Sequence, residues 1–169
     1  MNKDNSLFHI TLFKYLTEAE YDKVLERTNK IELQHEEVLF EANTPGHEIF
    51  LIETGRIKIF KRVDDQKIVF AELGAGAFFG EMSLLDEYNR SASAEGIESC
   101  TLRSLSRDEF MKIINNYDAI SAKLLLALAE VFSKRLRTTD KHLETYHLVN
   151  KALITNEEFR QLYKVINSP

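Results

Sequence analysis

The chain has 169 residues, a formal net charge of −5 and 44% apolar residues, with Cys100 as its single cysteine. This length and composition are sufficient for one folded domain with a hydrophobic core. No apolar run approaches the roughly 20 residues of a membrane span, the N-terminus shows no signal-peptide pattern, and one cysteine excludes an internal disulfide bond. These features favour a cytoplasmic protein with no membrane partner, in which Cys100 is a buried, unreactive thiol.

The charge balance also disfavours nucleic acid as a partner. Nucleic-acid binders need a basic face, because phosphate contacts supply most of their affinity. The sequence offers only two short basic runs, KIFKR and KRLR. We assign both to solvated faces.

Residues 1–30 are predicted to form N-terminal helices. Thr17 and Glu20 have the spacing of a capping box, in which each side chain bonds the other residue's backbone amide. The apolar residues Tyr21, Val24 and Leu25 follow at helical spacing.

Residues 31–107 read as a series of short strands. The apparent strands are rich in β-branched and aromatic residues, often alternate with polar ones, and are divided by turns such as Asn43–Gly46 and Gly74–Gly76. No helix of crossover length lies between them, which disfavours a parallel sheet. The pattern predicts an antiparallel sandwich or barrel. The predicted strands are IELQH, EVLFEA, EIFLIE, RIKIFKR, KIVFAEL, SAEGIE and TLRSLS.

Residues 108–169 are predicted to be helical. Ser106 and Glu109 form a second capping-box pattern, and Asp118 is placed to cap a long helix over about 118–148. A third box, Thr155–Glu158, predicts a last helix. The fold class is therefore α+β and mainly β, with helices gathered at both ends of a small antiparallel barrel.

One stretch, Phe79 to Ala94, departs from this alternation and carries candidate binding groups. A helical turn at Met82–Leu85 would point its free amides toward the preceding glycines, and free amides at a helix start attract anions. Gly80 allows a ligand to approach the backbone, and Arg90 adds a planar cation suited to phosphate oxygens. Glu81 would repel a phosphate unless the ligand also offers a hydroxyl donor, as a nucleotide does. The alternative is an Arg90–Glu81 ion pair with no ligand.

The motifs FGEMSLL and RSASA resemble the phosphate-binding cassette of the cyclic nucleotide-binding domain family. PGHEIFLIETGRIKIF is similar to the second and third strands of that family, and LGAGAFFGE to its glycine approach to the cassette. The resemblance spans about Leu12 to Leu136. It implies a β-roll, similar to a double-stranded β-helix or jelly roll, flanked by N- and C-terminal helices, with the cassette at 79–92.

The resemblance also implies roles for single residues. Glu81 would accept a hydrogen bond from the ribose 2′-hydroxyl, and Arg90 would pair with the cyclic phosphate. Gly80 would leave room for the ligand. Further phosphate contacts would come from the backbone amides of Met82, Ser83, Ser91 and Ala92, with the Ser91 hydroxyl as an added donor.

The base would lie against apolar side chains and under the long helix. The resemblance assigns Ile59 and Phe70 to the wall around the purine, with ordinary core packing as the alternative. It offers Arg135, Thr138 and Thr139 as candidates for capping the base, with an exposed helix face as the alternative.

The implied ligand is cAMP or cGMP, with no other cofactor. A hydroxyl residue after the arginine can bond the guanine amino group of cGMP, so Ser91 permits both. We favour cAMP, because in the family members that the chain most resembles a serine at this place accompanies cAMP.

The output is predicted to be non-catalytic signalling through an unknown effector protein. Residues 141–169 are too few for a winged helix-turn-helix unit, which favours a stand-alone receptor domain whose C-terminal helices respond to the ligand. An apolar seam of heptad-like spacing either packs on the barrel or pairs with a second copy in a homodimer. Its members are Leu125, Leu128, Phe132, Leu136, Thr139, Leu143 and Tyr146.

Three other interpretations compete. A cupin-type enzyme needs a cluster of metal-binding histidines, but the five histidines include no His-x-His pattern, and no Walker loop or nucleophile elbow occurs. We therefore expect neither catalysis nor a metal site. A ligand-free interaction or scaffold domain and a fragment of a cyclic-nucleotide-responsive transcription regulator remain as alternatives.

Overall fold

The computed structural model describes residues 9–64, 66–86 and 88–166. The chain divides into two compact units, Met1–Ala127 and Leu128–Pro169. The first unit holds the strands, the N-terminal helices and the start of the long helix. The second holds the rest of that helix and the last one, and each unit is described by itself. None of the described helices combines the length and apolarity that crossing a membrane would require.

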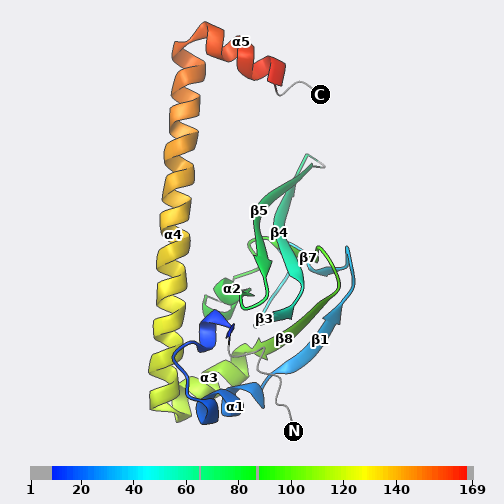
Figure 1. Ribbon diagram of the computed structural model, residues 1–169, viewed down its shortest axis with the longest axis vertical. Coiled ribbons are helices and arrows are strands. Elements are labelled where there is room, and N and C mark those ends of the chain that lie inside the picture. The colour runs from blue at the N-terminus through cyan, green and yellow to red at the C-terminus, as the bar shows by residue number, and fades with distance from the viewer. Residues whose placement is uncertain (1–8, 65, 87, 167–169) are drawn as a thin grey trace. The chain divides into compact units, whose positions relative to one another are not determined.

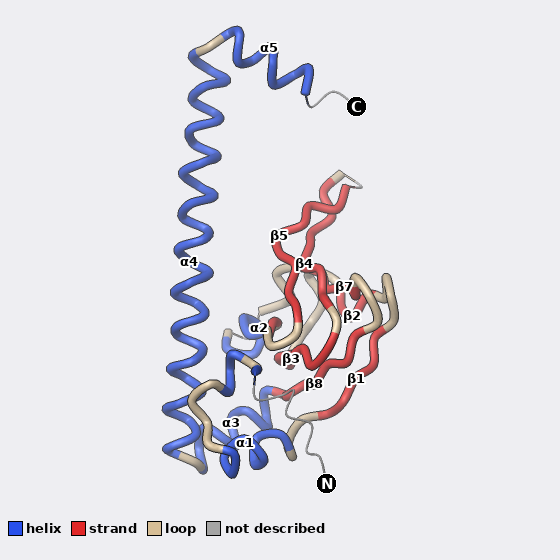
Figure 2. Tube along the Cα trace, in the orientation of Figure 1, coloured by secondary structure: helices blue, strands red, loops and turns tan. Residues whose placement is uncertain are grey.

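The first unit is a β-roll of two antiparallel four-stranded sheets, as predicted (Figure 1). Figure 2 shows the strands gathered in one body. Helical segments precede them and follow them along the chain. In strand order, one sheet contains β1 (Asn29–Leu33), β8 (Cys100–Ser106), β3 (Glu48–Thr54) and β6 (Phe78–Phe79). The other contains β2 (Val38–Phe40), β7 (Ser93–Gly96), β4 (Arg56–Val63) and β5 (Gln66–Gly74).

The core of the roll is apolar and has an aromatic cluster at one place. The rings of Phe50 and Phe79 stack with centroids 5.4 Å apart, and Phe40 lies 5.6 Å from Phe50. Ile57 and Ile59 of β4 also face the core, since Ile57 belongs to the buried cluster and Ile59 packs against it. Cys100 lies in β8 and is buried, as predicted, and burial raises the pKa of its thiol.

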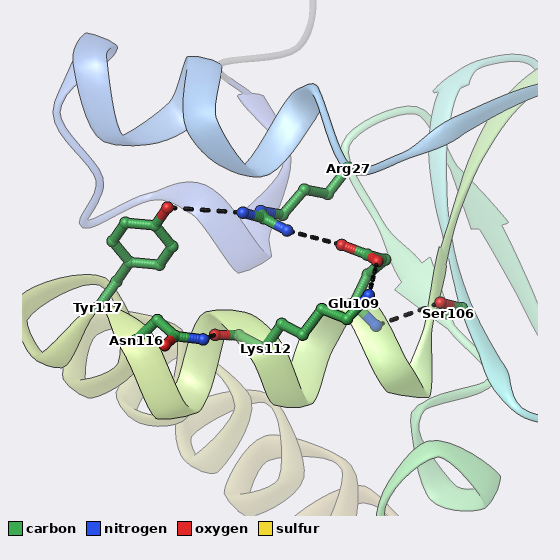
Figure 3. Close-up of polar contacts among 6 residues, drawn as sticks. All are labelled: Arg27, Ser106, Glu109, Lys112, Asn116 and Tyr117. Carbon is green, nitrogen blue, oxygen red and sulfur yellow. Dashed lines mark hydrogen bonds and ion pairs between the residues drawn. The ribbon is translucent and has the colours of Figure 1, made fainter.

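Two of the predicted capping boxes lie where the helices begin. The Thr17 amide donates to Glu20 Oε2 at 2.7 Å at the start of α1 (Glu18–Leu25). Ser106 Oγ accepts from the Glu109 amide at 3.3 Å at the start of α3 (Arg107–Asn116). The capping box predicts that the Glu109 side chain binds the Ser106 amide. Instead it forms ion pairs with Arg27 and Lys112 (Figure 3).

The long helix α4 runs from Asp118 to Thr155, seven residues beyond the predicted end near 148. Its first turns belong to the first unit and bury Ile120, Leu124 and Ala127. Asp118 is the first helical residue rather than the residue before it. The predicted third capping box is wrong, because the Thr155 hydroxyl donates to the Lys151 carbonyl at 2.8 Å within α4.

In the second unit, an arginine of the last helix binds backbone carbonyls at the end of α4. The last helix, α5, spans Glu157–Ile166. Arg160 donates from Nε to the Leu153 carbonyl at 2.8 Å and from Nη2 to the Ile154 carbonyl at 3.1 Å. A cation at carbonyls near a helix end satisfies groups that lack intrahelical partners. In the predicted seam, Leu128 is buried whereas Leu136, Leu143 and Tyr146 are exposed.

A pH-dependent contribution to stability is expected from Glu20. Its side chain binds Lys123 of α4 at 2.6 Å and also the Thr17 amide. The contact with Lys123 has the largest effect, and together the two lower the pKa of Glu20 from 4.5 to about 2. A carboxyl with a depressed pKa stabilises the folded state above its unfolded pKa and loses that effect as the pH falls through the folded value. The difference in melting temperature between the wild type and Glu20→Gln should therefore shrink as the pH is lowered from 4.5 towards 2. The exposed Glu18→Gln, in the same helical turn, is the matched control and should show a smaller difference at every pH.

Candidate functional site

The candidate site begins where β6 ends. Gly80 follows Phe79 with φ of 82°, in the left-handed region, and the short helix α2 (Glu81–Leu85) starts directly after it. The predicted helical turn at Met82–Leu85 is thus confirmed. The Arg107 side chain donates to the Leu84 carbonyl at 3.1 Å, which fixes the end of this turn to the start of α3.

Gly80 is required for two independent reasons. An L-residue in its left-handed conformation costs about 1–2 kcal/mol, and a Cβ there would stand 2.7 Å from Arg90 Nη1 and 2.9 Å from the Glu48 carbonyl oxygen. We expect Gly80→Ala to lower the free energy of unfolding by at least that backbone cost and to displace Arg90. Gly74→Ala is the control, because a Cβ at Gly74 meets nothing nearer than 3.9 Å. Denaturant unfolding of both variants tests this, and equal stability of the two would contradict it.

Arg90 is the central side chain of the site, and it is buried, with 5% of its surface exposed. Its Nη1 donates to the carbonyls of Glu48 (2.9 Å) and Gly80 (3.1 Å) and to Ser83 Oγ (2.8 Å). The guanidinium carbon lies 4.3 Å from the centre of the Phe40 ring, a cation–π contact. The side chain therefore points into the protein and joins α2, the start of β3 and the aromatic cluster.

This guanidinium has no carboxylate hydrogen-bond acceptor among the described residues. Its acceptors there are two backbone carbonyls and one hydroxyl, and Arg90 Nε is buried without a partner. Burial lowers the pKa of Arg90, while the charges of Glu48 and Glu81 oppose that shift. A buried cation that the protein neutralises only in part has capacity left for an anion.

The backbone on both sides of Arg90 is also held in place. The Arg90 amide donates to the Thr44 carbonyl and the Asn43 amide donates to the Arg90 carbonyl, each at 2.8 Å. Ser93 Oγ accepts from the Ala42 amide at 2.9 Å. Hydrogen bonds thus join the turn before β3 to the segment that enters β7, on both sides of Arg90.

The predicted phosphate-contact residues lie together around Arg90. Glu81 and Ser83 are buried, at 4% and 3% exposure, and Ala92 is buried as well. Met82 and Ser91 lie at the surface, and the Ser91 hydroxyl donates to Met82 Sδ at 3.7 Å. Two segments separated by several residues therefore form one cluster, although their contacts with a ligand remain predictions.

The predicted base-contact residues belong to both units. Ile59 pairs with Ala71 and Phe60 with Val69, so Phe70 falls at a bulge of the edge strand β5 and is 55% exposed. Ile59 instead packs against the core. Arg135, Thr138 and Thr139 lie in the second unit, where the Thr138 and Thr139 hydroxyls donate to the helix carbonyls of Lys134 and Arg135.

Sequence reasoning missed the residues that hold Arg90 from the other strands. Phe40, Phe50, Gly46 and the Glu48 carbonyl all contact or face the guanidinium. Gly46 carried a signal, because it follows Pro45 in a predicted turn. The aromatic residues carried none, since an inward-facing phenylalanine in a strand is ordinary core.

Comparisons with known proteins identify the class of domain. The family model described as "Cyclic nucleotide-binding domain" matches residues 30–117. The chain belongs to the cyclic nucleotide-binding domain family. The match runs from the second residue of β1 past the end of α3, and it includes the cluster around Arg90.

Curated relatives include bacterial regulators and a kinase subunit. The chain is 32% identical to the cyclic AMP receptor protein of Thermus thermophilus, over 79% of this chain and 60% of the relative. It is 26% identical to the CRP-like cAMP-activated global transcriptional regulator of Mycobacterium tuberculosis, over 83% and 61%. It is 28% identical to the cAMP-dependent protein kinase regulatory subunit of Neurospora crassa, over 75% and 32%. The chain thus spans about three fifths of the length of these bacterial relatives.

Solved structures have the same fold. The Thermus thermophilus catabolite activator protein superposes with a TM-score of 0.74 at 30% identity, over 82% of this chain and 64% of the other. A cyclic nucleotide-binding domain from Methylobacillus flagellatus gives a TM-score of 0.76 at 25% identity, over 83% and 82%. The second pair of chains is similar along most of both lengths.

Proposed function

We propose that this chain is a non-catalytic receptor for a cyclic nucleotide and that it prefers cAMP to cGMP. One observation carries the proposal: Arg90 is a buried cation without a carboxylate acceptor among the described residues, set beside a glycine and a helical turn. The phosphate of a 3′,5′-cyclic nucleotide is a compact monoanion. Its charge would complete the neutralisation of Arg90.

The other cassette residues would recognise the rest of the ligand. Glu81 is buried at the first position of α2, one residue from Gly80. A carboxylate accepts hydrogen bonds only, and the ribose 2′-hydroxyl is a donor that a cyclic nucleotide offers. The backbone amides of Met82, Ser83, Ser91 and Ala92 would supply further donors to the phosphate. Ile59 and Phe70 would form the wall around the base, and the exposure of Phe70 leaves its ring accessible.

The preference for cAMP is supported by the relatives, while Ser91 permits both nucleotides. The bacterial and fungal relatives are named for cyclic AMP. The regulatory domain of a Toxoplasma gondii protein kinase A, solved with cAMP, is 26% identical with a TM-score of 0.58, over 64% of this chain and 41% of the other. Ser91 lies at the surface with its hydroxyl on Met82.

We further propose that the ligand changes the C-terminal helices, through which the chain would signal to an effector protein or to a second copy. Arg135, Thr138 and Thr139 are the candidates for the link to the base. A ligand can drive such a change only if it favours one arrangement over the other. Hydrogen exchange across residues 119–166, measured with and without saturating cAMP, tests this, and identical protection in both states would disprove it.

Calorimetric titration of the full chain with cAMP and cGMP tests the receptor function directly. We expect micromolar or tighter binding of at least one of them, with cAMP the tighter. The non-cyclic 5′-AMP, which carries the same base but a different phosphate, is the control ligand and should bind much more weakly. Equal affinity for 5′-AMP and cAMP would mean that the site does not recognise the cyclic phosphate.

A further inference from the structure

The three nitrogens of the Arg90 guanidinium have different surroundings. Nη1 has three acceptors: the Glu48 and Gly80 carbonyls and Ser83 Oγ. Nε is buried and lies against Gly46, where a Cβ would come within 2.0 Å of it. Nη2 has no acceptor among the described residues. Among the described residues, the protein therefore supplies acceptors to Nη1, encloses Nε without an acceptor, and leaves Nη2 for a ligand.

Two residues from distant parts of the chain produce this asymmetry. Ser83 comes from α2 and is 3% exposed, and its hydroxyl is the side-chain acceptor of Nη1, at 2.8 Å. Gly46 comes from the turn before β3 and leaves room for Nε and Cζ, both of which a Cβ would approach within 2.5 Å. Neither residue has a charge or a large side chain, so their effect is on the position of Arg90.

We propose that Ser83 and Gly46 are positioning residues that hold the Arg90 guanidinium so that Nη2, and not Nη1, faces the phosphate of the ligand. This inference rests on the proposed receptor function. Because the guanidinium is planar, fixing Nη1 and Nε also fixes the direction of the Nη2 hydrogens. With Nη1 held by the protein, Nη2 should bind one of the two exocyclic phosphate oxygens in preference to the other.

Phosphorothioate analogues of cAMP distinguish the two oxygens. In the Sp and Rp diastereomers, sulfur replaces one or the other exocyclic oxygen, and sulfur accepts hydrogen bonds more weakly than oxygen. The wild type should bind the two diastereomers with clearly unequal affinity. Equal affinity in the wild type, with intact cAMP binding, would overturn the assignment of Nη2.

Ser83→Ala should weaken cAMP binding by about tenfold, because it removes a hydrogen bond to a charged group. It should also bring the ratio of the Sp and Rp dissociation constants closer to one, since the guanidinium then has a second orientation open to it. Gly46→Ala should weaken cAMP binding more than Ser83→Ala does. It should also bring the ratio of the Sp and Rp dissociation constants still closer to one. Gly74→Ala is the matched glycine control and should leave both unchanged. A loss of affinity with an unchanged ratio would overturn the positioning role.

A ligand-independent readout separates this inference from the receptor function. The Nε–H of Arg90 gives its own signal in a ¹H–¹⁵N NMR spectrum, assigned by its absence in Arg90→Lys, and burial should make its exchange with water slow. That exchange should become faster in Ser83→Ala and Gly46→Ala but not in Gly74→Ala. If the wild type binds no cyclic nucleotide, the receptor function fails while this measurement still decides whether the two residues position Arg90.

Discussion

Arg90→Ala should weaken cyclic-nucleotide binding by about 2–5 kcal/mol, or roughly thirty-fold to several thousand-fold. The loss is large because the phosphate would face a site from which its buried counter-charge is missing. Arg90→Lys should fall between the wild type and the alanine variant, because an ammonium keeps the charge but not the planar fork. Titration calorimetry with cAMP measures all three affinities.

Two controls make this result specific. Arg62→Ala removes an arginine that is exposed at the end of β4, so its cAMP affinity should equal that of the wild type. Thermal unfolding of the Arg90 variants without ligand shows whether the roll still folds, since Arg90 also binds the Glu48 and Gly80 carbonyls. A folded Arg90→Ala protein that binds cAMP like the wild type would place the anion elsewhere and disprove the site.

The sequence predicts those parts of the fold that depend on interactions between residues close together in the chain, such as helix starts and alternating strands. The capping residues Thr17 and Ser106 lie at the starts of α1 and α3, and alternating strands form both sheets. The two-residue β6 was not recognised as a strand, because two phenylalanines are too few to show alternation. The predicted end of α4 is too early, although Asn150–Thr155 contains no glycine or proline to stop a helix, because Thr155 also has the pattern of a cap for the next helix.

The candidate site was predictable in its cassette but not in its support. Gly80, Glu81 and Arg90 are close in sequence, so their motif shows them together. The contacts of Arg90 with Phe40 and with the Glu48 carbonyl join residues 42 or more positions apart, which only the pairing of the sheets brings into reach. The exposure of Phe70 is equally hidden in the sequence, since Ile68 and Val69 beside it in β5 are also apolar and also exposed.

The second large effect on affinity is expected at Glu81, and ligands with and without the ribose 2′-hydroxyl measure it. In the wild type, 2′-deoxy-cAMP should bind roughly ten-fold to a hundred-fold more weakly than cAMP, because the complex would lose one hydrogen bond to the buried Glu81 carboxylate. Glu81→Ala should weaken cAMP binding to a similar degree but leave little further loss for the deoxy ligand. The affinities of two proteins for two ligands form a thermodynamic cycle, and its coupling energy isolates the contact between the carboxylate and the hydroxyl.

Asp86→Asn is the matched control for this cycle. Asp86 is exposed at the end of α2, so its variant changes the charge of the same cassette by one unit without touching a buried group. It should keep the full discrimination against 2′-deoxy-cAMP. Persistent discrimination in Glu81→Ala would show that the sugar hydroxyl binds another group. Loss of discrimination in Asp86→Asn as well would show that the net charge of the cassette, and not a contact with Glu81, sets the preference.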